Sequence, residues 1–457
     1  MENLPAKRIL KGILKTILVI FVLALAFGAY YINTLIPIIT GYPAKFLCSA
    51  VFVSGREQAE VEAMDLNFSF IKYVKSEVNL QDSSVTSRFL WGKSKAIYRE
   101  GFGATLLRDV DKAELRAVKF PKVEPAFHPD TLPWPAGNIV PDSTTGIDLA
   151  VMEELTEKLM SGGYNGHAFA FLVLHKGVPV AEAYQPEFNS STRFLSWSVA
   201  KSFTNALAGI MVKDGTWDIN QPAAVPEWQA DDRKNITLNN LLQMQSGLRW
   251  NEDYGNRSDV TVMLYCENDF AKFAYSQPLE NQPGTKWYYS SGTVNILNYL
   301  MRRKIGNDEA YYRFAKARLF DKLGMNTAVF ETDASGTQVG SSYVYATARD
   351  YARFGLLYLN DGVFNGERIL SDGWVNYTTT PAADSNGGYG ALFWLNKGGK
   401  LPSVPADMYS CNGHDGQQIY IIPSKDLVVV VLGYSPKPDK VMNFDLLLSD
   451  VISTVGD

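Results

Sequence analysis

Residues that build disulfide scaffolds and metal centres are scarce in this 457-residue sequence. Its three cysteines, Cys48, Cys266 and Cys411, are far apart and form no Cys-x-x-Cys pair, which excludes a disulfide scaffold and a cysteine-rich zinc module. The four histidines include no His-Glu-x-x-His motif, so the sequence offers little from which to build a metalloenzyme. We therefore expect no metal site.

An excess of charge of one sign is also absent. Lysine and arginine number 43, and aspartate and glutamate 48, so the formal net charge is −5 and no global attraction to nucleic acid is expected. The apolar share of 46% is ordinary for a packed protein and excludes wholesale disorder. At about 100–200 residues per domain, the length allows one large domain with additions, or two to three small domains. Length and composition do not define the oligomeric state.

One strongly apolar stretch lies near the N-terminus. Residues 16–44 carry no charge, residues 17–32 are the most apolar, and four basic residues precede them: Lys7, Arg8, Lys11 and Lys15. Extended slightly at either end, the apolar part reaches the ~20 residues that span a bilayer. Basic residues on one side only place the N-terminus in the cytoplasm. We predict a single-pass membrane protein, with residues 1–44 as cytoplasmic tip and anchor and the rest periplasmic or otherwise extracytoplasmic.

Two other interpretations of this stretch stay open. Ala24-Leu25-Ala26 has the small-x-small form of a signal-peptide cleavage site, although cleavage there leaves an apolar region of only about seven or eight residues. The stretch is also compatible with a buried helix. An anchor and a cleaved signal peptide both export the remaining chain.

Residues 45–145 form the least regular part of the sequence. Residues 46–53 resemble a short apolar strand, and residues 67–71 alternate like a second one. Between 120 and 145, prolines recur too often for a helix or an interior strand, which indicates an extended connector on the surface of the main domain. We assign residues 45–145 as an N-terminal extension and proline-rich connector.

The pattern becomes regular in residues 146–457, which we assign to one domain. Its centre, roughly 198–380, is mostly helical, and strand-like runs lie towards both ends. The expected outer helices are 147–159 and 441–455, and the expected strands are 168–174, 178–184, 418–422 and 427–432. The prediction is an α+β fold, in which an antiparallel sheet built from both ends is flanked by helices and a helical lobe is inserted between them.

Two Ser-x-x-Lys tetrads carry candidate chemistry, although chance alone predicts about two in a chain of this length. Context separates them. The tetrad from Ser69 to Lys72 lies in a strand-like alternation, where its two polar side chains point to opposite faces, which indicates a structural role. The tetrad from Ser198 to Lys201 opens a run with helical spacing, in which positions i and i+3 are neighbours.

The second tetrad has the parts of a nucleophilic site. On a helix the Lys201 amine can reach the Ser198 hydroxyl, and a serine needs a base to become a nucleophile. The lysine serves only when neutral, which requires a pKa lowered by about 3 units, or roughly 4 kcal/mol. The Ser198 N–H lies in the first helical turn, where unpaired donors suit a developing oxyanion. The alternative is a plain helix N-terminus with an exposed lysine.

Two further motifs are weak alone. Residues 283–291, Pro-Gly-Thr-Lys-Trp-Tyr-Tyr-Ser-Ser, contain Tyr289, either a phenol that Lys201 could help to hold ionised or a core aromatic. Residues 411–418, Cys-Asn-Gly-His-Asp-Gly-Gln-Gln, lead into a strand, and their two glycines allow a close backbone approach. His414 within them is on its own an ordinary surface histidine.

Taken in this order, the three motifs resemble the signature of penicillin-recognising serine hydrolases: Ser-x-x-Lys, a tyrosine loop after Pro-Gly-Thr, and a Lys- or His-x-Gly strand. The sequence is similar to the class C β-lactamase-like branch, in particular to 6-aminohexanoate-dimer hydrolase-like proteins. The likeness covers about residues 147–457 and implies a β-lactamase/transpeptidase-like fold. Further stretches that carry it are 194–202, 236–248, 340–350 and 416–432.

The resemblance implies roles for individual residues. Ser198 would be the acylated nucleophile, and Lys201 and Tyr289 would share the general-base and general-acid work. The backbone N–H groups of Ser198 and Gln417 would form the oxyanion hole. This chemistry needs no cofactor.

Two positions depart from the family pattern. Tyr-x-Asn reads Tyr-Ser-Ser, so Ser291 replaces the amide that helps to hold a β-lactam side chain. Lys-Thr-Gly reads His-Asp-Gly, from His414 to Gly416, which removes a permanent cation for a substrate carboxylate. Both changes favour a serine hydrolase of small esters, amides or short peptides. The alternatives are a non-catalytic cell-envelope binding protein with this fold, and a true β-lactamase or D,D-carboxypeptidase.

Overall fold

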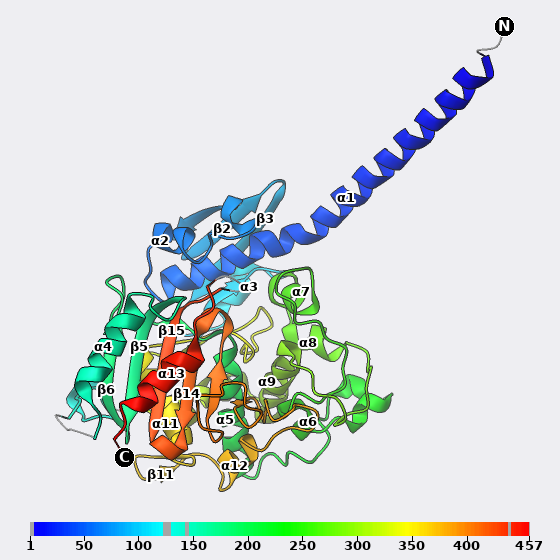
Figure 1. Ribbon diagram of the computed structural model, residues 1–457. Helices are drawn as coiled ribbons and strands as arrows, with labels where there is room; N and C mark the ends of the chain where they lie inside the picture. The colour runs from blue at the N-terminus through cyan, green and yellow to red at the C-terminus, as the bar shows by residue number, and fades with distance from the viewer. Residues whose placement is uncertain (1–3, 122–128, 142–145, 437–439, 457) are drawn as a thin grey trace.

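The computed structural model describes residues 4–121, 129–141, 146–436 and 440–456. Its largest sheet has the strand order β12-β13-β14-β15-β5-β6, and each neighbouring pair is antiparallel (Figure 1). The strands come from the two ends of the main domain, as predicted. They are β5 (His167–His175), β6 (Val178–Tyr184), β12 (Trp394–Leu395), β13 (Tyr409–Asn412), β14 (Gln418–Ile422) and β15 (Leu427–Tyr434).

The two-residue period of the strands supplies both faces of this sheet with apolar side chains. In β15, Val429 and Val431 face one side and Val428 and Val430 face the other, and all four are fully buried. Because helices cover both faces, the central strands read as continuous apolar runs. The first face is covered by α4 (Leu149–Met160) and α13 (Phe444–Ser453), and the second by α11 (Ala348–Leu359), with α5 (Ala200–Lys213) packed beyond it.

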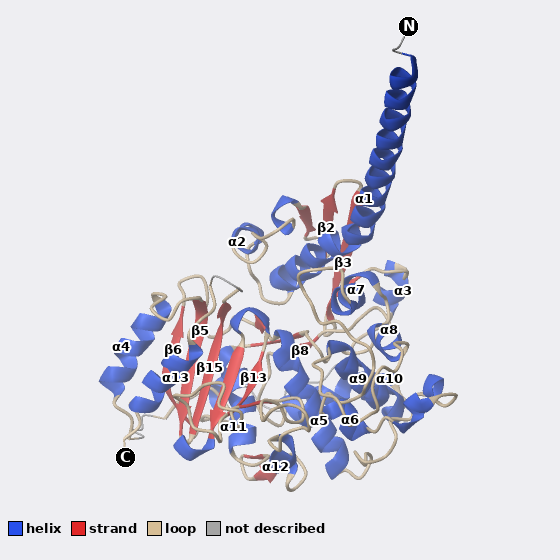
Figure 2. Cartoon of the chain, turned by 45° about the vertical axis from the view of Figure 1, so that its right-hand side comes forward, coloured by secondary structure: helices blue, strands red, loops and turns tan. Residues whose placement is uncertain are grey.

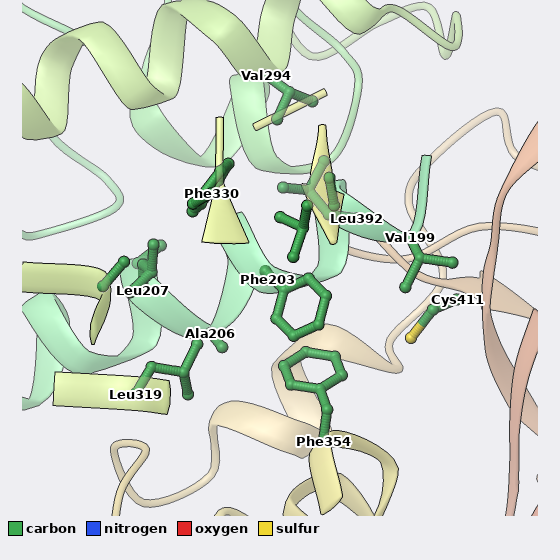
Figure 3. Close-up of a cluster of buried hydrophobic side chains, with 14 of the residues drawn as sticks. Val199, Phe203, Ala206, Leu207, Val294, Leu319, Phe330, Phe354, Leu392 and Cys411 are labelled. Carbon is green, nitrogen blue, oxygen red and sulfur yellow. The ribbon is translucent and has the colours of Figure 1, made fainter. Parts of the chain in front are cut away.

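Helix α5 lies in the core between the sheet and the helical lobe. Its Phe203 meets Phe354 of α11 with ring centroids 4.2 Å apart, and Figure 3 shows the two rings facing each other. Every residue from 200 to 211 is buried. A close-packed helix of this kind has little freedom to rotate or slide. The side chains at its first turn are therefore held in fixed positions.

The helical lobe lies between α5 and α11 along the chain, as predicted (Figure 2). Its helices are α6 (Leu238–Leu242), α7 (Asp259–Cys266), α8 (Phe270–Tyr275), α9 (Ser291–Ile305) and α10 (Asp308–Ala315). Two small antiparallel sheets and one short helix complete the domain. They are β7-β9-β8 (Phe194–Leu195, Val344–Ala346, Val329–Phe330), β10-β11 (Val363–Phe364, Glu367–Arg368) and α12 (Trp374–Thr378).

A single helix, α1 (Leu4–Phe52), carries the apolar N-terminal stretch and continues into the folded protein. Residues 17–32 project from the body, and all but Gly28 among them are exposed, whereas Ala44 and Leu47 are buried (Figure 1). This helix is long and apolar enough to cross a membrane, a test that a signal sequence also passes. The apolar stretch is not a buried helix, which removes one of the three interpretations.

The extension is a small unit built on the second half of α1. Its antiparallel sheet has the order β1-β2-β3-β4 (Lys75–Asn79, Ser84–Phe89, Gly92–Arg99, Gly103–Leu106), and its short helices are α2 (Gln58–Ala63) and α3 (Lys112–Ala117). The strand predicted at 46–53 is wrong, because residues 46–52 form the end of α1 and Val53 lies in the turn after it; a short apolar run alone does not separate helix from strand. The alternation at 67–71 is not a strand either, and leads into a 3₁₀ turn, Ile71–Tyr73.

The extension packs against the main domain through a buried ion pair. Lys45 Nζ lies 2.5 Å from Glu331 Oε2, and both side chains are almost fully buried. The other carboxylate oxygen accepts hydrogen bonds from the Ser49 hydroxyl and the Ala104 N–H. A buried charge that is paired and hydrogen-bonded in this way is tolerated, whereas loss of one partner is strongly destabilising. The boundary expected between residues 44 and 45 falls inside α1, one residue from this contact.

The proline-rich connector lies along the main domain where the structure describes it. The Trp134 indole donates to the Gly177 carbonyl, and the Arg353 guanidinium donates to the carbonyls of Pro135 and Gly137. Residues 122–128 and 142–145, which belong to the predicted connector, lie outside the described residues.

Candidate active site

Ser198 lies in a short 3₁₀ turn, Trp197–Val199, that leads directly into α5. Trp197 is buried and has φ = 44°, a left-handed conformation that bulky residues rarely adopt. Such a conformation persists only where the surrounding structure imposes it, and it is frequent at functional sites. One turn further on, Lys201 Nζ lies 2.9 Å from Ser198 Oγ. The neighbouring arrangement predicted for the tetrad is present.

The Lys201 amine is buried, with only 1% of the residue exposed, and three oxygen atoms lie within hydrogen-bond distance of it. Besides Ser198, Nζ lies 3.0 Å from the Ser291 hydroxyl and 2.8 Å from the Ser341 carbonyl oxygen. Burial lowers the pKa of Lys201 to about 8, against an opposing effect of the Glu252 carboxylate. A neutral amine has two hydrogens and one lone pair. It can therefore donate to Ser291 and Ser341 and accept the Ser198 hydroxyl proton.

Tyr289 completes this group of side chains. Its ring centroid lies 4.8 Å from Lys201 Nζ, and its phenol lies close enough to Ser198 for that side chain to lower the pKa of the phenol. Desolvation and the Glu252 carboxylate raise the pKa of the Tyr289 phenol above its ordinary value, and the neighbouring Ser198 side chain only partly offsets them. The phenol is therefore neutral near pH 7. This direction is opposite to the expectation that Lys201 helps to hold it ionised.

Glu252 is a neighbour of the site that the sequence analysis missed. Its Oε2 accepts a hydrogen bond from the Ser291 N–H at 2.9 Å, and its Oε1 accepts one from the Ser291 hydroxyl at 2.5 Å. Because Ser291 is the first residue of α9, the carboxylate lies at the positive end of that helix. The indole of Trp250 donates to the same carboxylate. Nothing in a single sequence distinguishes this residue from the other 47 acidic ones.

The third motif lies beside the turn that carries Ser198. His414 starts a short turn, His414–Gly416, and its ring meets the Trp197 ring edge-on at 5.4 Å. The Tyr254 ring stacks on His414 at 5.2 Å and meets the Trp197 ring edge-on at 6.4 Å, so the three rings form one cluster, and the Tyr254 phenol lies beside Ser291. His414 Nε2 lies 3.3 Å from Asp415 Oδ1, so a protonated His414 is already paired. Burial raises the pKa of Asp415, and His414 lowers it in part.

Two glycines and Gln417 shape the strand after this turn. The Gln417 side chain is tied to Gly433, donating to its carbonyl at 2.5 Å and accepting from its N–H at 3.2 Å. A Cβ on Gly413 would lie 2.4 Å from the Ser196 carbonyl oxygen, so only glycine allows this close approach to the segment before Ser198. Gly416 has φ = 97°, as the turn requires. The oxyanion role of the Gln417 backbone N–H stays a prediction.

A cavity of about 930 Å³ lies on the other side of Tyr254 and His414, between the main domain and the extension. Its lining combines aromatic, apolar and polar side chains from both parts of the chain. The lining residues are Glu60, Ala63, Met64, Asn67, Phe68, Asn165, Gly166, His167, Tyr254, Gly255, His414, Asp415, Tyr434, Pro436 and Lys440.

Comparisons with known proteins identify the family to which the chain belongs. The Beta-lactamase family matches residues 152–450, so the chain belongs to this family. A 6-aminohexanoate-dimer hydrolase of Paenarthrobacter ureafaciens is 28% identical over 297 residues, which cover 59% of this chain and 73% of the relative. The family and its relatives define the chain as a serine hydrolase related to β-lactamases, a group that includes esterases, amidases and penicillin-binding proteins.

Solved structures share the fold at low sequence identity. A protein of Bacillus anthracis assigned to the 6-aminohexanoate-dimer hydrolases superposes with a TM-score of 0.56 at 21% identity, covering 71% of this chain and 87% of that one. EstA of Arthrobacter nitroguajacolicus superposes with a TM-score of 0.52 at 16% identity, covering 67% and 96%. The β-lactamase/transpeptidase-like fold is thereby confirmed.

Proposed function

We propose that the protein hydrolyses an ester or amide bond of a small molecule or short peptide through an acyl-enzyme on Ser198. One observation carries the proposal: a buried amine with a pKa lowered to about 8 lies 2.9 Å from the Ser198 hydroxyl. At pH 7 roughly one lysine in ten is then neutral, against fewer than one in a thousand at the ordinary pKa. That fraction supplies a base for the serine.

In acylation, Lys201 accepts the Ser198 proton as the serine oxygen attacks the carbonyl carbon. The oxyanion that forms is stabilised by the backbone N–H groups of Ser198 and Gln417. The leaving alcohol or amine receives a proton from Tyr289, whose raised pKa keeps its phenol protonated, and the phenol recovers a proton from Lys201. In deacylation, a water gives a proton to Lys201 as its oxygen attacks the acyl carbon, and Lys201 then returns that proton to the Ser198 oxygen as the bond to the acyl carbon breaks.

The departures from the β-lactamase pattern support small esters and amides as substrates. The serine at position 291 is fully engaged by Lys201 and Glu252, so it does not replace the missing amide as a substrate contact. A protonated His414 is paired with Asp415 and offers a substrate carboxylate less than a free lysine would. The 6-aminohexanoate-dimer hydrolase relative, an enzyme named for a dimer of a small amino acid, supports the same class of substrate.

The proposal includes a membrane anchor. The exposed, apolar first half of α1 would span the bilayer once, with its basic N-terminal end in the cytoplasm and the hydrolase domain in the periplasm or otherwise outside the cytoplasm. The second half of α1 would connect this span rigidly to the protein, since Leu47 and Cys48 are part of a buried core with β2, β3 and β4.

A fluorophosphonate probe tests the nucleophile on the full chain in detergent micelles. The wild type should be labelled, Ser198→Ala should not, and Ser69→Ala, which removes the serine of the other tetrad, should be labelled like the wild type. Equal labelling of the wild type and Ser198→Ala would exclude the assignment. Nitrocefin hydrolysis at a rate comparable with that of p-nitrophenyl esters would instead favour a β-lactamase. Labelling without turnover of any ester or amide would favour a binding protein.

A further inference from the structure

One wall of the 930 Å³ cavity comes from outside the region that matches the family. The matched region is 152–450, yet Met64, Asn67 and Phe68 of the extension line the cavity. Phe68 meets the Tyr42 ring of α1 edge-on at 5.6 Å. The wall is therefore held against the same helix that carries the apolar N-terminal stretch.

The opposite wall is shared with the candidate active site. The stacked rings of Tyr254 and His414 line the cavity on one side. Tyr254 also lies beside Ser291, a hydrogen-bond partner of Lys201, and both rings contact Trp197, the residue before Ser198. The cavity wall is therefore in direct contact with residues that flank the candidate reacting groups.

We propose that this cavity binds the part of the substrate remote from the scissile bond, and that it takes an apolar chain or ring. The inference rests on the proposed function and adds the class of substrate to it. The volume lies near the upper end of the roughly 300–1,000 Å³ that ligand pockets span. Phe68, Tyr434 and Tyr254 supply aromatic surface, and Met64 is flexible enough to fit apolar groups of several shapes. The lining carries acidic groups, Glu60 and Asp415, as well as the basic Lys440, so it has no cluster of one sign to bind a charged group.

The test compares esters of increasing chain length on the full chain in one detergent. Two series are used: p-nitrophenyl esters with acyl chains of two to eight carbons, and butyrate esters of alcohols of the same lengths. In one of the series, wild-type kcat/KM should rise with length. Phe68→Ala should lower kcat/KM about tenfold for the longest member of that series and less than twofold for the shortest, since each buried methylene contributes about 0.8 kcal/mol. Partial misfolding would lower kcat/KM for every ester by the same factor. It therefore cancels from the ratio of kcat/KM for the longest ester to that for the shortest ester of the same protein.

Phe70→Ala is the matched control, because Phe70 lies two residues from Phe68, is 58% exposed and is absent from the cavity lining. It should keep the wild-type length profile. If the wild type hydrolyses esters but Phe68→Ala also keeps that profile, the cavity is not the substrate subsite. If none of the three proteins hydrolyses any ester or amide, the proposed function itself fails.

A second inference comes from a different surface, the tip of the β2–β3 hairpin. Leu90 and Trp91 form this turn and are 64% and 63% exposed. The Trp91 indole donates to Asn33 Oδ1 of α1 at 3.1 Å, and Gly92 packs directly against Ile36. The tip therefore meets α1 where its exposed apolar stretch ends and its buried half begins (Figures 1 and 2).

A neighbouring loop adds further exposed aromatic residues. Phe70 and Tyr73 are 58% and 61% exposed, and the Phe70 ring lies 6.5 Å from that of Phe89 beside the hairpin tip. Lys72 and Lys93, on the same two segments, are also exposed. Aromatic rings together with lysines are the typical composition of a surface at the boundary between lipid and water.

We infer that the hairpin tip and this loop lie in the bilayer interface beside the span, and fix the orientation of the hydrolase domain on the membrane. The inference rests on the proposed anchor. The uncharged helix from residue 16 to residue 33 is about 27 Å long at 1.5 Å per residue, close to a hydrocarbon core of about 30 Å. Asn33, and the tip bound to it, then lie at the level of the lipid headgroups. A single span alone would leave the domain free to tilt.

The sheet supplies its own control for this inference. Leu80 lies in the β1–β2 turn, at the opposite end of the same sheet, and is 71% exposed. Leu90→Cys, Leu80→Cys and Tyr30→Cys are each introduced into a Cys266→Ser background, since Cys48 and Cys411 are buried. Each protein is labelled with the environment-sensitive fluorophore NBD and placed in nanodiscs of phosphatidylcholine and phosphatidylglycerol containing a doxyl-labelled quencher lipid.

Label at position 90 should shift to the blue and be quenched, whereas label at position 80 should show neither effect. Label at position 30, on the apolar part of α1, shows whether this part of the helix lies in the bilayer. Quenching at 30 with equal, weak quenching at 90 and 80 would overturn the second membrane contact. Absence of quenching at 30 would overturn the anchor itself.

Discussion

The two Ser-x-x-Lys tetrads have the same spacing and entirely different surroundings. Ser69 and Lys72 are exposed on the extension, Ser69 has φ = 44°, and the lysine amine lies over the ring of Tyr73. Ser198 and Lys201 open a helix of the core, with the amine buried. The four-residue pattern is common by chance. Burial at a helix start is what turns one copy into candidate chemistry, because burial lowers the pKa of Lys201 towards neutral pH.

The largest difference between the tetrads is expected in catalysis. Lys201→Met should lower kcat/KM for a p-nitrophenyl ester by about 10²–10⁴, the range usually contributed by general-base catalysis. Lys72→Met, the matched change in the exposed tetrad, should stay within twofold of the wild type. The measurement is steady-state hydrolysis by the full chain in detergent. Equal losses of kcat/KM in Lys201→Met and Lys72→Met would mean that the buried tetrad has no special role in catalysis.

The next effect concerns stability. The pKa of Lys201 is lowered from 10.5 to about 8 in the folded state, so between these values the unfolded chain binds more protons and stability rises with pH. Burying the charged Lys201 amine lowers the free energy of unfolding. This loss is fully present below pH 8 and disappears above pH 10.5, where the amine is neutral in both states. Comparing wild type with Lys201→Met, the difference in free energy of unfolding should change by about 3 kcal/mol between pH 7 and pH 10.5.

Urea unfolding at the two pH values measures this change, and Lys72→Met serves as the control. The exposed lysine of the first tetrad should give a difference from wild type that does not vary with pH. A pH-independent difference for Lys201→Met as well would mean that the buried amine keeps its ordinary pKa.

A smaller effect is expected in the pH profile of the wild type. If neutral Lys201 is the base, kcat/KM should rise with pH and level off above the pKa of about 8, so that the rate at pH 7 is about tenfold below the plateau. Profiles of kcat/KM from pH 5.5 to 9.5 measure this rise. A flat profile across pH 7–9 would assign the proton transfer to another group.

The smallest expected effect is a shift of the pH range, here called the limb, over which kcat/KM rises. Glu252 raises the pKa of Lys201, so Glu252→Gln should move the limb to lower pH while keeping an oxygen acceptor for Ser291. Asp253→Asn is the control, since this exposed carboxylate bonds only to Gly255 and Asn256 among the described residues. If Glu252→Gln lowers the kcat/KM plateau but kcat/KM still rises over the same pH range as in the wild type, Glu252 only holds α9 in place.

Much of the fold was predictable because the main sheet has a clear sequence pattern. Residues 168–174 and 427–432 are uninterrupted apolar runs between turn residues, and they became β5 and β15. The extension was not predictable in the same way. Residues 46–52 are equally apolar but complete α1, because their burial against β2 and β3 follows a helical period that only the partner sheet reveals.

By itself, the sequence determined the class of fold, the order of its parts, and the tetrad with the phenol from which a serine hydrolase would be built. Local periodicity and motif spacing carry that information, since they depend on neighbours along the chain. Tertiary structure decided the rest: the burial that lowers the pKa of Lys201, the carboxylate of Glu252 at the start of α9, and the wall that the extension adds to the cavity. These depend on residues distant in sequence, whose packing no local pattern records.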